Sequence, residues 1–483
     1  MIGVRLLEKP FIKLFHTPNS GYFYDVGKNE IIRIPEEVYM HLSDVMAGKN
    51  LLGQSKDESV CQVIESFLEL GYLSSKHPSK IQHTATALVP LLLNRCVDKI
   101  TLQLTQDCNF RCKYCIYSEE KNLKQRSHAK RSMSLETAQK AIRFYRDHAV
   151  DSNLYNVGLY GGEPLLQWDL LQAVVLFAEK ELTGKLLTFS LTTNASLMTE
   201  PMAAFLEEHN VGVLISFDGV KPVNDKNRVF RDGKGTSDMV LKNIRMIKER
   251  HPRLFEKLRI NSVIDPEIEI PLFGKYPCEL ESIPVSSFTA TIEESNDQEV
   301  AIPLELSNAI ETESFHAFLE KFGQYSLPIS PYGYGQVENI YEHMKSMKST
   351  NGIQNIMAPS GPCVPGKGRL FVSVDGHLYP CERVNETPAY CIGDLDSGFD
   401  YEVAKRLLNV GTITEAECKN CWAIRHCSLC GKYFDYTQKD AGEEKKKMCP
   451  SIRSSVKKQI RAMIMLSEMD TYYKELVNLR DSI

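Results

Sequence analysis

The sequence predicts an α/β fold: a parallel sheet, open or closed as a barrel, between a small N-terminal unit and a cysteine-rich C-terminal region. Two observations favour this fold class. Between residues 100 and 263, short apolar runs of strand length alternate with segments whose apolar residues recur at helical spacing. In addition, eleven of the fourteen cysteines fall into two groups, one inside the predicted barrel and one after it. A chain of 483 residues is long enough for about three domains.

The N-terminal unit, residues 1–80, is expected to consist of three short strands followed by two helices. The strands are Phe11–Phe15, Tyr22–Val26 and Ile31–Ile34, and the helices run from Pro35 and over Val60–Leu70. A Gly-Lys-Asn turn separates the second and third strands, which predicts a hairpin. Three strands followed by helices are typical of a winged-helix-like domain. The next segment, Lys76–Ala85, is predicted to be a linker.

Residues 96–320 are assigned to the barrel. Its strands are predicted at Ile100–Leu104, Val157–Tyr160, Leu187–Thr192, Val211–Phe217 and Leu258–Val263. Helices are predicted between them at Leu135–His148, Leu170–Lys180, Glu200–Glu208 and Asp238–Glu249. Nearly continuous apolar strands separated by helices indicate a parallel sheet. In folds of this kind the functional residues gather at the carboxyl ends of the strands.

Charge and composition exclude several classes of protein. The 57 basic and 62 acidic residues give a net charge of −5, which argues against nucleic acid as a partner. Residues 1–15 have no sustained apolar run of the kind found in a signal peptide, and no stretch is apolar enough to predict a membrane span. We therefore expect a cytoplasmic protein whose cysteines serve as metal ligands or reactive thiols rather than disulfides.

The first cysteine group directly follows the first barrel strand. Cys108, Cys112 and Cys115 have the spacing C-x₃-C-x₂-C, so three thiolates can meet in one loop. Soft thiolate ligands select iron–sulfur clusters or zinc. Three ligands would leave one iron of a cubane open to a substrate or cofactor, whereas the alternative is a structural zinc loop or three unrelated cysteines.

Three further motifs each follow a predicted strand. They are Tyr160-Gly-Gly-Glu-Pro164, Thr192-Thr-Asn194 and Ser216-Phe-Asp-Gly219. With the cysteine loop counted as the first motif, the two glycines of the second motif, Tyr160–Pro164, allow a ligand to approach the backbone, and its glutamate can receive an ammonium group. In this order and with the cysteine loop, the motifs resemble those of the radical S-adenosylmethionine (SAM) enzymes over residues 96–266.

That resemblance implies a partial (β/α)6 barrel as the fold. It also implies a [4Fe–4S] cluster on the three cysteines, with the methionine part of SAM on the open iron. Such enzymes cleave SAM reductively to a 5′-deoxyadenosyl radical, which abstracts a hydrogen from the substrate. The residues implied in SAM binding are Tyr114 beside the adenine; Gly161, Gly162 and Glu163 at the amino group; Asn194, Ser216 and Asp218 at the ribose or methionine; and Arg228 at the carboxylate. One departure from the family pattern is Ala195, where glycine is commoner.

The second cysteine group lies in residues 355–455. Two C-x₂-C pairs this close could form one zinc site, but the eight cysteines exceed one tetrahedral site and match two. Their spacing resembles the SPASM extension of radical SAM enzymes, except that two residues rather than three precede Cys430. The resemblance implies a first auxiliary cluster on Cys363, Cys381 and Cys430, and a second on Cys418, Cys421, Cys427 and Cys449. Cys391 is either a fourth ligand of the first auxiliary cluster or a buried thiol.

The N-terminal unit then resembles the precursor-recognition domain of ribosomal-peptide maturases, which adds the leader peptide as a strand to its sheet edge. Together the parts resemble maturases that build thioether cross-links in cysteine-rich peptides, the sactipeptide and ranthipeptide group. This implies three [4Fe–4S] clusters, a precursor peptide as partner and a reductant such as flavodoxin or ferredoxin. Glu382, directly after Cys381, is a candidate for proton transfer, and a C-terminal helix is expected over residues 456–483.

Other functions remain open on the sequence. An anaerobic sulfatase maturase has the same barrel and extension but lacks a leader-binding domain. A peptide maturase could instead form carbon–carbon bonds or epimerise residues. Outside these enzymes, an iron–sulfur electron carrier or a zinc scaffold would use the same cysteines without catalysis.

Overall fold

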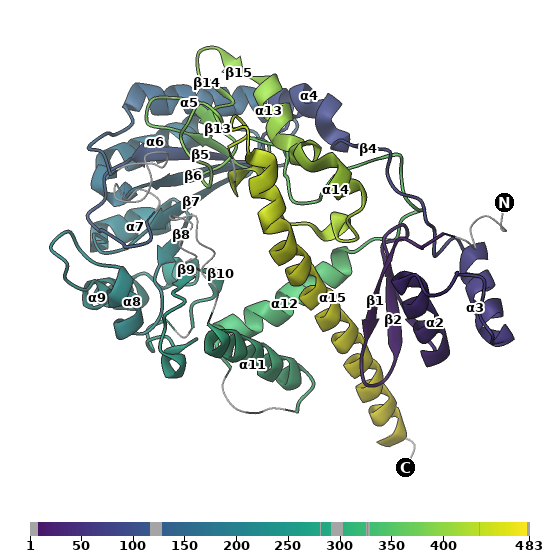
Figure 1. The fold of residues 1–483 in the computed structure, drawn as a ribbon. Helices are drawn as coiled ribbons and strands as arrows, with labels where there is room; N and C mark the ends of the chain where they lie inside the picture. Colours follow the sequence, from purple (N-terminus) through teal and green to yellow (C-terminus); the bar gives the residue numbers. More distant parts are fainter. Residues whose placement is uncertain are drawn as a thin grey trace. The chain divides into compact units, whose positions relative to one another are not determined.

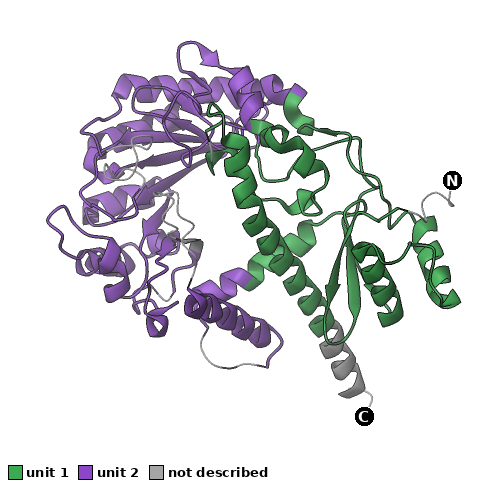
Figure 2. Cartoon of the chain, in the orientation of Figure 1, with its two compact units in different colours: residues 1–86, 337–363, 408–483 green, residues 87–336, 364–407 purple. Residues whose placement is uncertain are grey.

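The computed structural model describes residues 8–115, 128–280, 282–290, 303–324, 326, 329–433 and 435–480. The chain forms two compact units, coloured separately in Figure 2. Unit 1 comprises residues 1–86, 337–363 and 408–483, and unit 2 comprises residues 87–336 and 364–407. The cysteine-rich region 355–455 thus contributes to both units. The domain boundaries expected from the sequence stay predictions.

Unit 2 is built on one eight-stranded sheet, with the strand order β10-β9-β8-β7-β6-β5-β12-β13. The strands are β5 (Ile100–Thr105), β6 (Tyr155–Gly161), β7 (Leu187–Thr193), β8 (Val211–Ser216), β9 (Leu258–Ile264), β10 (Val285–Ala290), β12 (Leu370–Val372) and β13 (Leu378–Tyr379). All neighbours pair in parallel except β13, which is antiparallel to β12. The predicted parallel sheet is confirmed, and it continues past β5 through β12, a strand that the sequence did not reveal.

Apolar side chains decide which face of each strand is buried. In β8, Val211, Val213 and Ile215 are buried and alternate with partly exposed residues, whereas every residue of β5 is buried. The helices of the unit are α4 (Val89–Arg95), α5 (Leu135–His148), α6 (Trp168–Glu181), α7 (Glu200–Glu208), α8 (Lys221–Asn227), α9 (Ser237–Arg250), α10 (Pro252–Phe255), α11 (Leu304–Lys321) and α13 (Tyr401–Leu408). Figure 1 shows α5, α6 and α7 along the outside of the sheet. The strand–helix alternation expected from residue 100 is therefore present.

Unit 1 contains an antiparallel sheet in the order β1-β2-β3, formed by β1 (Ile12–His16), β2 (Gly21–Asp25) and β3 (Glu30–Ile34). Helices α2 (Glu36–Ala47) and α3 (Glu58–Glu69) follow. The expected three strands and two helices are confirmed as elements, while the winged-helix comparison stays a prediction.

Both faces of this small sheet are buried. On one face, Phe23 packs with residues of α2 and α3, among them Leu42 and Ile64. On the other face, its neighbours Tyr22 and Tyr24 belong to a second core with residues from the far end of the chain. That core includes Ile353, Met357, Val456, Ile460 and Ile464. The N-terminal and C-terminal segments therefore share one core.

Two expectations about unit 1 are wrong. The segment Lys76–Ala85 is not a linker, because it forms β4 (Lys80–Ile81), which pairs with β11 (Ile356–Met357) and buries Ile81. The expected C-terminal helix is present as α15, but it runs over Ala441–Arg480 and so begins fifteen residues before the predicted start at residue 456. Its first turns carry Lys445 and Cys449, and Pro450 lies inside it without ending it.

The other elements are short or connect the two units. They are η1 (Thr84–Leu88), η2 (Pro164–Gln167), η3 (Ile270–Leu272), α12 (Pro331–Ser346), β14 (Gly393–Asp394), β15 (Gly398–Phe399), η4 (Val410–Thr414), α14 (Glu415–Lys419), η5 (Ile424–His426) and η6 (Gly431–Tyr433). Among the described residues, no helix has both the length and the apolar composition needed to cross a membrane.

Candidate active site

The loop that follows β5 carries the first three cysteines. Cys108 and Cys112 are buried and Cys115 is half-buried. Burial raises the pKa of the Cys112 thiol to about 12, and the charge of Cys115 contributes in the same direction against the opposing effect of Arg228. Burial also raises the pKa of Cys108, which is sensitive to the charges of Cys112 and Cys115. The three thiols are thus close enough to influence one another, as ligands of one cluster must be.

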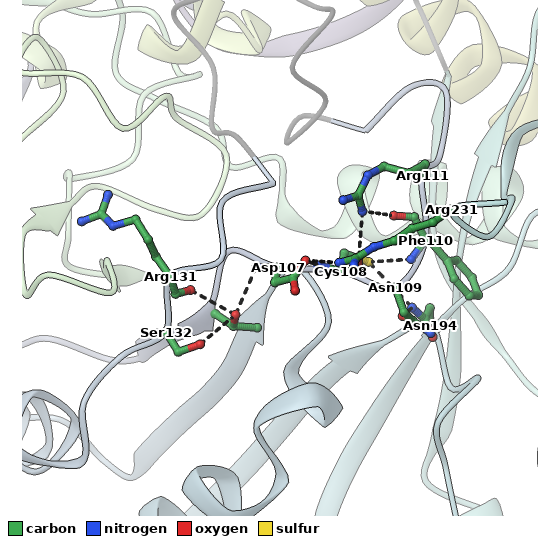
Figure 3. Close-up of polar contacts among 10 residues, drawn as sticks. Asp107, Cys108, Asn109, Phe110, Arg111, Arg131, Ser132, Asn194 and Arg231 are labelled. Atoms are coloured by element: carbon green, nitrogen blue, oxygen red, sulfur yellow. Dashed lines mark hydrogen bonds and ion pairs between the residues drawn. The ribbon is translucent and has the colours of Figure 1, made fainter. Parts of the chain in front are cut away.

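Two arginines hold the backbone at the first cysteine (Figure 3). The carbonyl oxygen of Cys108 accepts hydrogen bonds from Arg111 Nη1 at 2.7 Å and from Arg231 Nε and Nη2 at 3.1 and 2.7 Å. Arg231 also forms an ion pair with Asp107. Charged donors fix this carbonyl more firmly than neutral ones would. The position of the first thiol therefore depends on a residue 123 positions away in the sequence.

The cysteine loop also pairs with the segment after α8. The backbone amide of Arg111 donates to the carbonyl of Val229 at 2.8 Å, and that of Lys113 donates to Asn227 at 3.1 Å. The rings of Phe110 and Phe230 meet edge to face with centroids 5.0 Å apart. This pairing brings Arg228, a predicted SAM-binding residue, beside the cysteines.

Arg228 is the centre of a buried polar group. Its Nη2 is 2.9 Å from Asp218 Oδ1, and its guanidinium carbon lies 5.4 Å from the centre of the Tyr114 ring. Tyr114 in turn donates its hydroxyl to Asp218 Oδ2. Although Arg228 is only 6% exposed, its Nε has no hydrogen-bond partner among the described residues. The structure thus brings together three of the residues predicted to bind SAM, with one buried donor left over.

The glutamate of the second motif is used within the protein. Glu163 is 1% exposed; its Oε1 accepts from Thr193 Oγ1 at 2.6 Å and from the Leu165 amide at 3.0 Å, and its Oε2 accepts from the Asn194 amide at 2.7 Å. Burial raises its pKa to about 7, against the lowering effect of these three donors. The carboxylate therefore joins the ends of β6 and β7, and its contact with a SAM amino group stays a prediction.

The two glycines before Glu163 are required by close backbone contact. A Cβ on Gly161 would lie 2.3 Å from the carbonyl oxygen of Thr105, and one on Gly162 would lie 2.1 Å from that of Asp107. The Gly162 amide donates to Thr105 at 2.8 Å. Any larger residue would push the end of β6 away from the cysteine loop, because these contacts are with backbone atoms.

The third motif ends β7 and contacts the first cysteine. Asn194 Nδ2 donates to Asn109 Oδ1 at 2.9 Å and lies 3.9 Å from Cys108 Sγ. Ala195 adopts a φ of +57° and is completely buried. The turn usually made by glycine is therefore kept with an alanine. Ser216, at the carboxyl end of β8, is partly exposed.

The residues of this site suit a [4Fe–4S] cluster with SAM bound to it. The three thiols interact through their charges, and the free Nε of Arg228 can receive a carboxylate. Among the described residues, no three His, Cys, Asp or Glu side chains are gathered as ligands of a single metal ion would be. Three neighbouring thiols are the donors that an iron–sulfur cluster takes.

Two glutamates near the barrel differ in their partners. Glu382, the candidate for proton transfer, accepts from Arg369 Nη1 at 2.6 Å, and its Oε2 is buried without a partner among the described residues. Glu386 accepts from Gln103 Nε2 at 2.6 Å and from Gln106 Nε2 at 3.1 Å. Both glutamines are buried at the carboxyl end of β5, two to five residues before the first cysteine. The catalytic role of Glu382 stays a prediction, and Glu386 is a second candidate.

Sequence reasoning missed Glu386 and the two arginines around the first cysteine. A signal was present for Glu386, because Gln103 and Gln106 are amides in an otherwise apolar strand end and need partners when buried. No local signal could identify Arg231, whose role depends on where α8 returns the chain.

All fourteen cysteines are free thiols. Of the second group, Cys363, Cys418, Cys421, Cys427, Cys430 and Cys449 belong to unit 1, and Cys381 and Cys391 belong to unit 2. The thiol of Cys391 lies 3.2 Å from the carbonyl oxygen of Gly393. The pKa of Cys427 is raised to about 11 by burial, with contributions from the charges of Cys421 and Cys418. The division of these cysteines between two auxiliary clusters stays a prediction.

The fold and the site define a radical SAM protein. Residues 102–263 match the family model of the Radical SAM superfamily. This match confirms the resemblance to radical SAM enzymes that the cysteine loop and the strand-end motifs indicate.

Two curated relatives are similar over much of the chain. The radical SAM cyclopropyl synthase TigE of Paramaledivibacter caminithermalis is 22% identical over 444 residues, which are 86% of each chain. The cysteine-type anaerobic sulfatase-maturating enzyme of Clostridium novyi is 24% identical over 66% of this chain and 83% of its own. Residues 102–263 thus form a radical SAM domain, and the chain is similar over much of its length to enzymes with these names.

The fold is also shared with a solved structure. That structure, native anSMEcpe with bound AdoMet, has a TM-score of 0.57 and 18% identity, covering 80% of this chain and all of the other. The same protein with AdoMet and the Cp18Cys peptide gives a TM-score of 0.56. At this identity the likeness establishes the fold.

Proposed function

We propose that this protein is a radical SAM maturase that forms thioether cross-links in a ribosomally made, cysteine-containing precursor peptide. Three [4Fe–4S] clusters and SAM would be its cofactors. When bound, SAM at the first cluster supplies the 5′-deoxyadenosyl radical that removes a hydrogen atom from the peptide. In the cross-linking step the peptide cysteine would lose its proton, its sulfur would bond to the acceptor carbon, and an auxiliary cluster would serve as acceptor of the one electron released.

The residues of unit 2 have defined tasks in this proposal. Arg228 holds the SAM carboxylate through its free Nε, while Asp218 fixes the guanidinium by an ion pair at 2.9 Å. Arg111 and Arg231 keep the cysteine loop in place through the Cys108 carbonyl. Burial of the site excludes water from the radical.

The observation that carries the peptide assignment is the edge of the small sheet in unit 1. Among the described residues, β3 pairs with β2 on one side and with no strand on the other. A cavity of about 710 Å³ lies along this edge. Its lining includes Ile31 and Arg33 of β3, Met344 of α12 and Met463 of α15. An extended peptide can add to such an edge through backbone hydrogen bonds while its side chains enter the cavity.

Binding of the leader peptide can be tested at this edge. Ile31→Glu replaces one of the apolar side chains that line the cavity by a carboxylate and is expected to weaken leader binding by at least tenfold, measured by fluorescence anisotropy. Met40→Glu is the matched control, because Met40 is 56% exposed on α2. SAM cleavage without peptide should be equal in both variants. Equal leader affinity in the two variants would contradict the proposed docking edge.

The cross-linking reaction is tested by mass spectrometry of the treated precursor. Each thioether removes two hydrogen atoms and makes one cysteine unreactive to alkylation. An unchanged mass, or the same shift on a cysteine-free precursor, would refute thioether formation. No 5′-deoxyadenosine from the reduced, reconstituted protein would favour an electron carrier instead.

The sulfatase-maturase alternative is supported by the similarity to the Clostridium novyi enzyme and to anSMEcpe. The two reactions differ in their products, because oxidation of a cysteine to formylglycine removes its sulfur, whereas a thioether retains it. Treatment of a cysteine-containing sulfatase peptide and of a leader-bearing precursor under the same conditions separates them.

A further inference from the structure

Unit 1 contains a buried lysine that the proposed mechanism does not use. Lys445, in the first turns of α15, is 1% exposed. Its ammonium donates to the hydroxyl of Thr414 and to Cys418 Sγ, the latter at 3.2 Å. Thr414 Oγ1 is itself 3.6 Å from the same sulfur.

No carboxylate of the part of the chain that the structure describes is bonded to this ammonium. Among the described residues, Lys445 forms no ion pair, and Glu417, whose pKa responds to its charge, is bonded to Lys446 at 2.9 Å. A charged group buried without an opposite charge is strongly destabilising, so such groups are paired in stable proteins. The group that this ammonium does contact is the sulfur of Cys418, which would be a thiolate as a ligand of a cluster.

Cys418 is one of four neighbouring thiols. The pKa of Cys427 responds to the charges of Cys421 and Cys418, and that of Cys449 responds to Cys418 and Lys445. Cys449 is one helical turn after Lys445, and its Sγ lies 3.4 Å from the Lys445 carbonyl oxygen. Four thiols and one buried cation thus occupy a single region of unit 1, and the donor chemistry suits a tetrathiolate [4Fe–4S] cluster.

We propose that Lys445 is the counter-cation of the second auxiliary cluster and raises its reduction potential. One-electron reduction adds a negative charge to the cluster, and a fixed ammonium beside a ligand sulfur stabilises that charge. Hydrogen bonds to cluster sulfurs are one of the means by which proteins set such potentials. This cluster would then accept the electron released in the proposed thioether formation more readily than it could without the lysine. The inference rests on the cluster assignment in the proposed function.

The experiment measures the potential rather than the activity. Wild-type protein and variants are reconstituted in a background that lacks the first cluster, with Cys108, Cys112 and Cys115 replaced by alanine. Each is titrated with dithionite as the electron donor, and the reduced clusters are followed by electron paramagnetic resonance. The variants are Lys445→Met, which removes charge and donor, and Lys445→Gln, which keeps a donor. Lys446→Met is the control, because Lys446 is 41% exposed and bonded to Glu417 and Glu443.

We expect one of the two couples to become at least tenfold harder to reduce in both Lys445 variants, which corresponds to a fall of about 59 mV for a one-electron couple. The control should keep both potentials. Unchanged potentials in iron-replete Lys445 variants would overturn the inference, as would an equal shift in the control.

The iron content separates two kinds of failure. A wild-type full chain that binds far fewer than about twelve irons would refute the auxiliary clusters, and the inference with them. If Lys445→Met fails to retain its iron, Lys445→Gln decides the question. Loss of iron in both while the control retains it would identify Lys445 as a structural residue and overturn its assigned role in tuning the potential.

Discussion

Glu163 makes the stability of the metal-free protein depend on pH. Burial raises its pKa from the ordinary 4.5 to about 7. Between these two values the folded protein holds a proton that the unfolded chain has released, so the free energy of unfolding falls as the pH rises. At 1.36 kcal/mol for each tenfold change, the full effect is about 3 kcal/mol. This contribution is complete below pH 4.5 and is lost as the pH rises through 7.

The perturbation is Glu163→Gln, which removes the titrating group. Urea unfolding of metal-free wild type and variant at several pH values from 5 to 8 gives the difference in stability. Relative to the variant, the free energy of unfolding of the wild type should fall by about 1.4 kcal/mol per pH unit up to pH 7 and stay constant above it. Asp151→Asn is the control, because the hydrogen bond from Arg95 lowers the pKa of Asp151 and that carboxylate is ionised in both states over this range. A difference in the free energy of unfolding between wild type and Glu163→Gln that does not change with pH would contradict a raised pKa of Glu163.

Three other changes have defined expectations. Ala195→Gly should raise the free energy of unfolding in urea by about 0.5–1 kcal/mol, because relief of the positive φ exceeds the entropy cost of glycine. Gly184→Ala, at another positive φ, should lower it. Arg231→Met removes two donors to the Cys108 carbonyl and should speed chelator-induced loss of iron from the first cluster several-fold. An unchanged rate would show that Arg111 alone is enough to hold this carbonyl. Glu386→Gln should lower the yield of modified peptide at least tenfold while leaving SAM cleavage unchanged, and Glu382→Gln should lower that yield less. A larger loss in Glu382→Gln would instead favour Glu382 as the residue that transfers the proton.

The elements of the barrel were predictable because each carries its own periodic signal. The helices at Leu135–His148 and Glu200–Glu208 begin and end as predicted. By contrast, β12 has only three residues and is a strand because it pairs with β5. Similarly, Lys80–Ile81 is surrounded by polar residues, and only its pairing with Ile356–Met357 makes it a strand. Short elements of this kind depend on tertiary contacts that a local pattern does not contain.

The candidate site likewise has residues that the sequence predicts and contacts that it does not predict. The cysteine loop and its neighbours Glu163 and Arg228 follow spaced motifs, so their approximate location was predictable. Their partners were not, because the three donors to Glu163 and the ion pair of Arg228 depend on how the strand ends meet. Arg231 illustrates the limit, since its contact with the Cys108 carbonyl spans 123 residues.

The shared core of unit 1 also determines the order of events during synthesis. The second face of the β1-β2-β3 sheet packs on Ile353, Val456 and Ile464, so it stays uncovered until nearly the whole chain has left the ribosome. Methionines of α12 and α15 complete the lining of the cavity along β3 at the same late stage. A nascent chain therefore has its barrel sequence before the cavity along β3 is complete, since that cavity needs α15 as well.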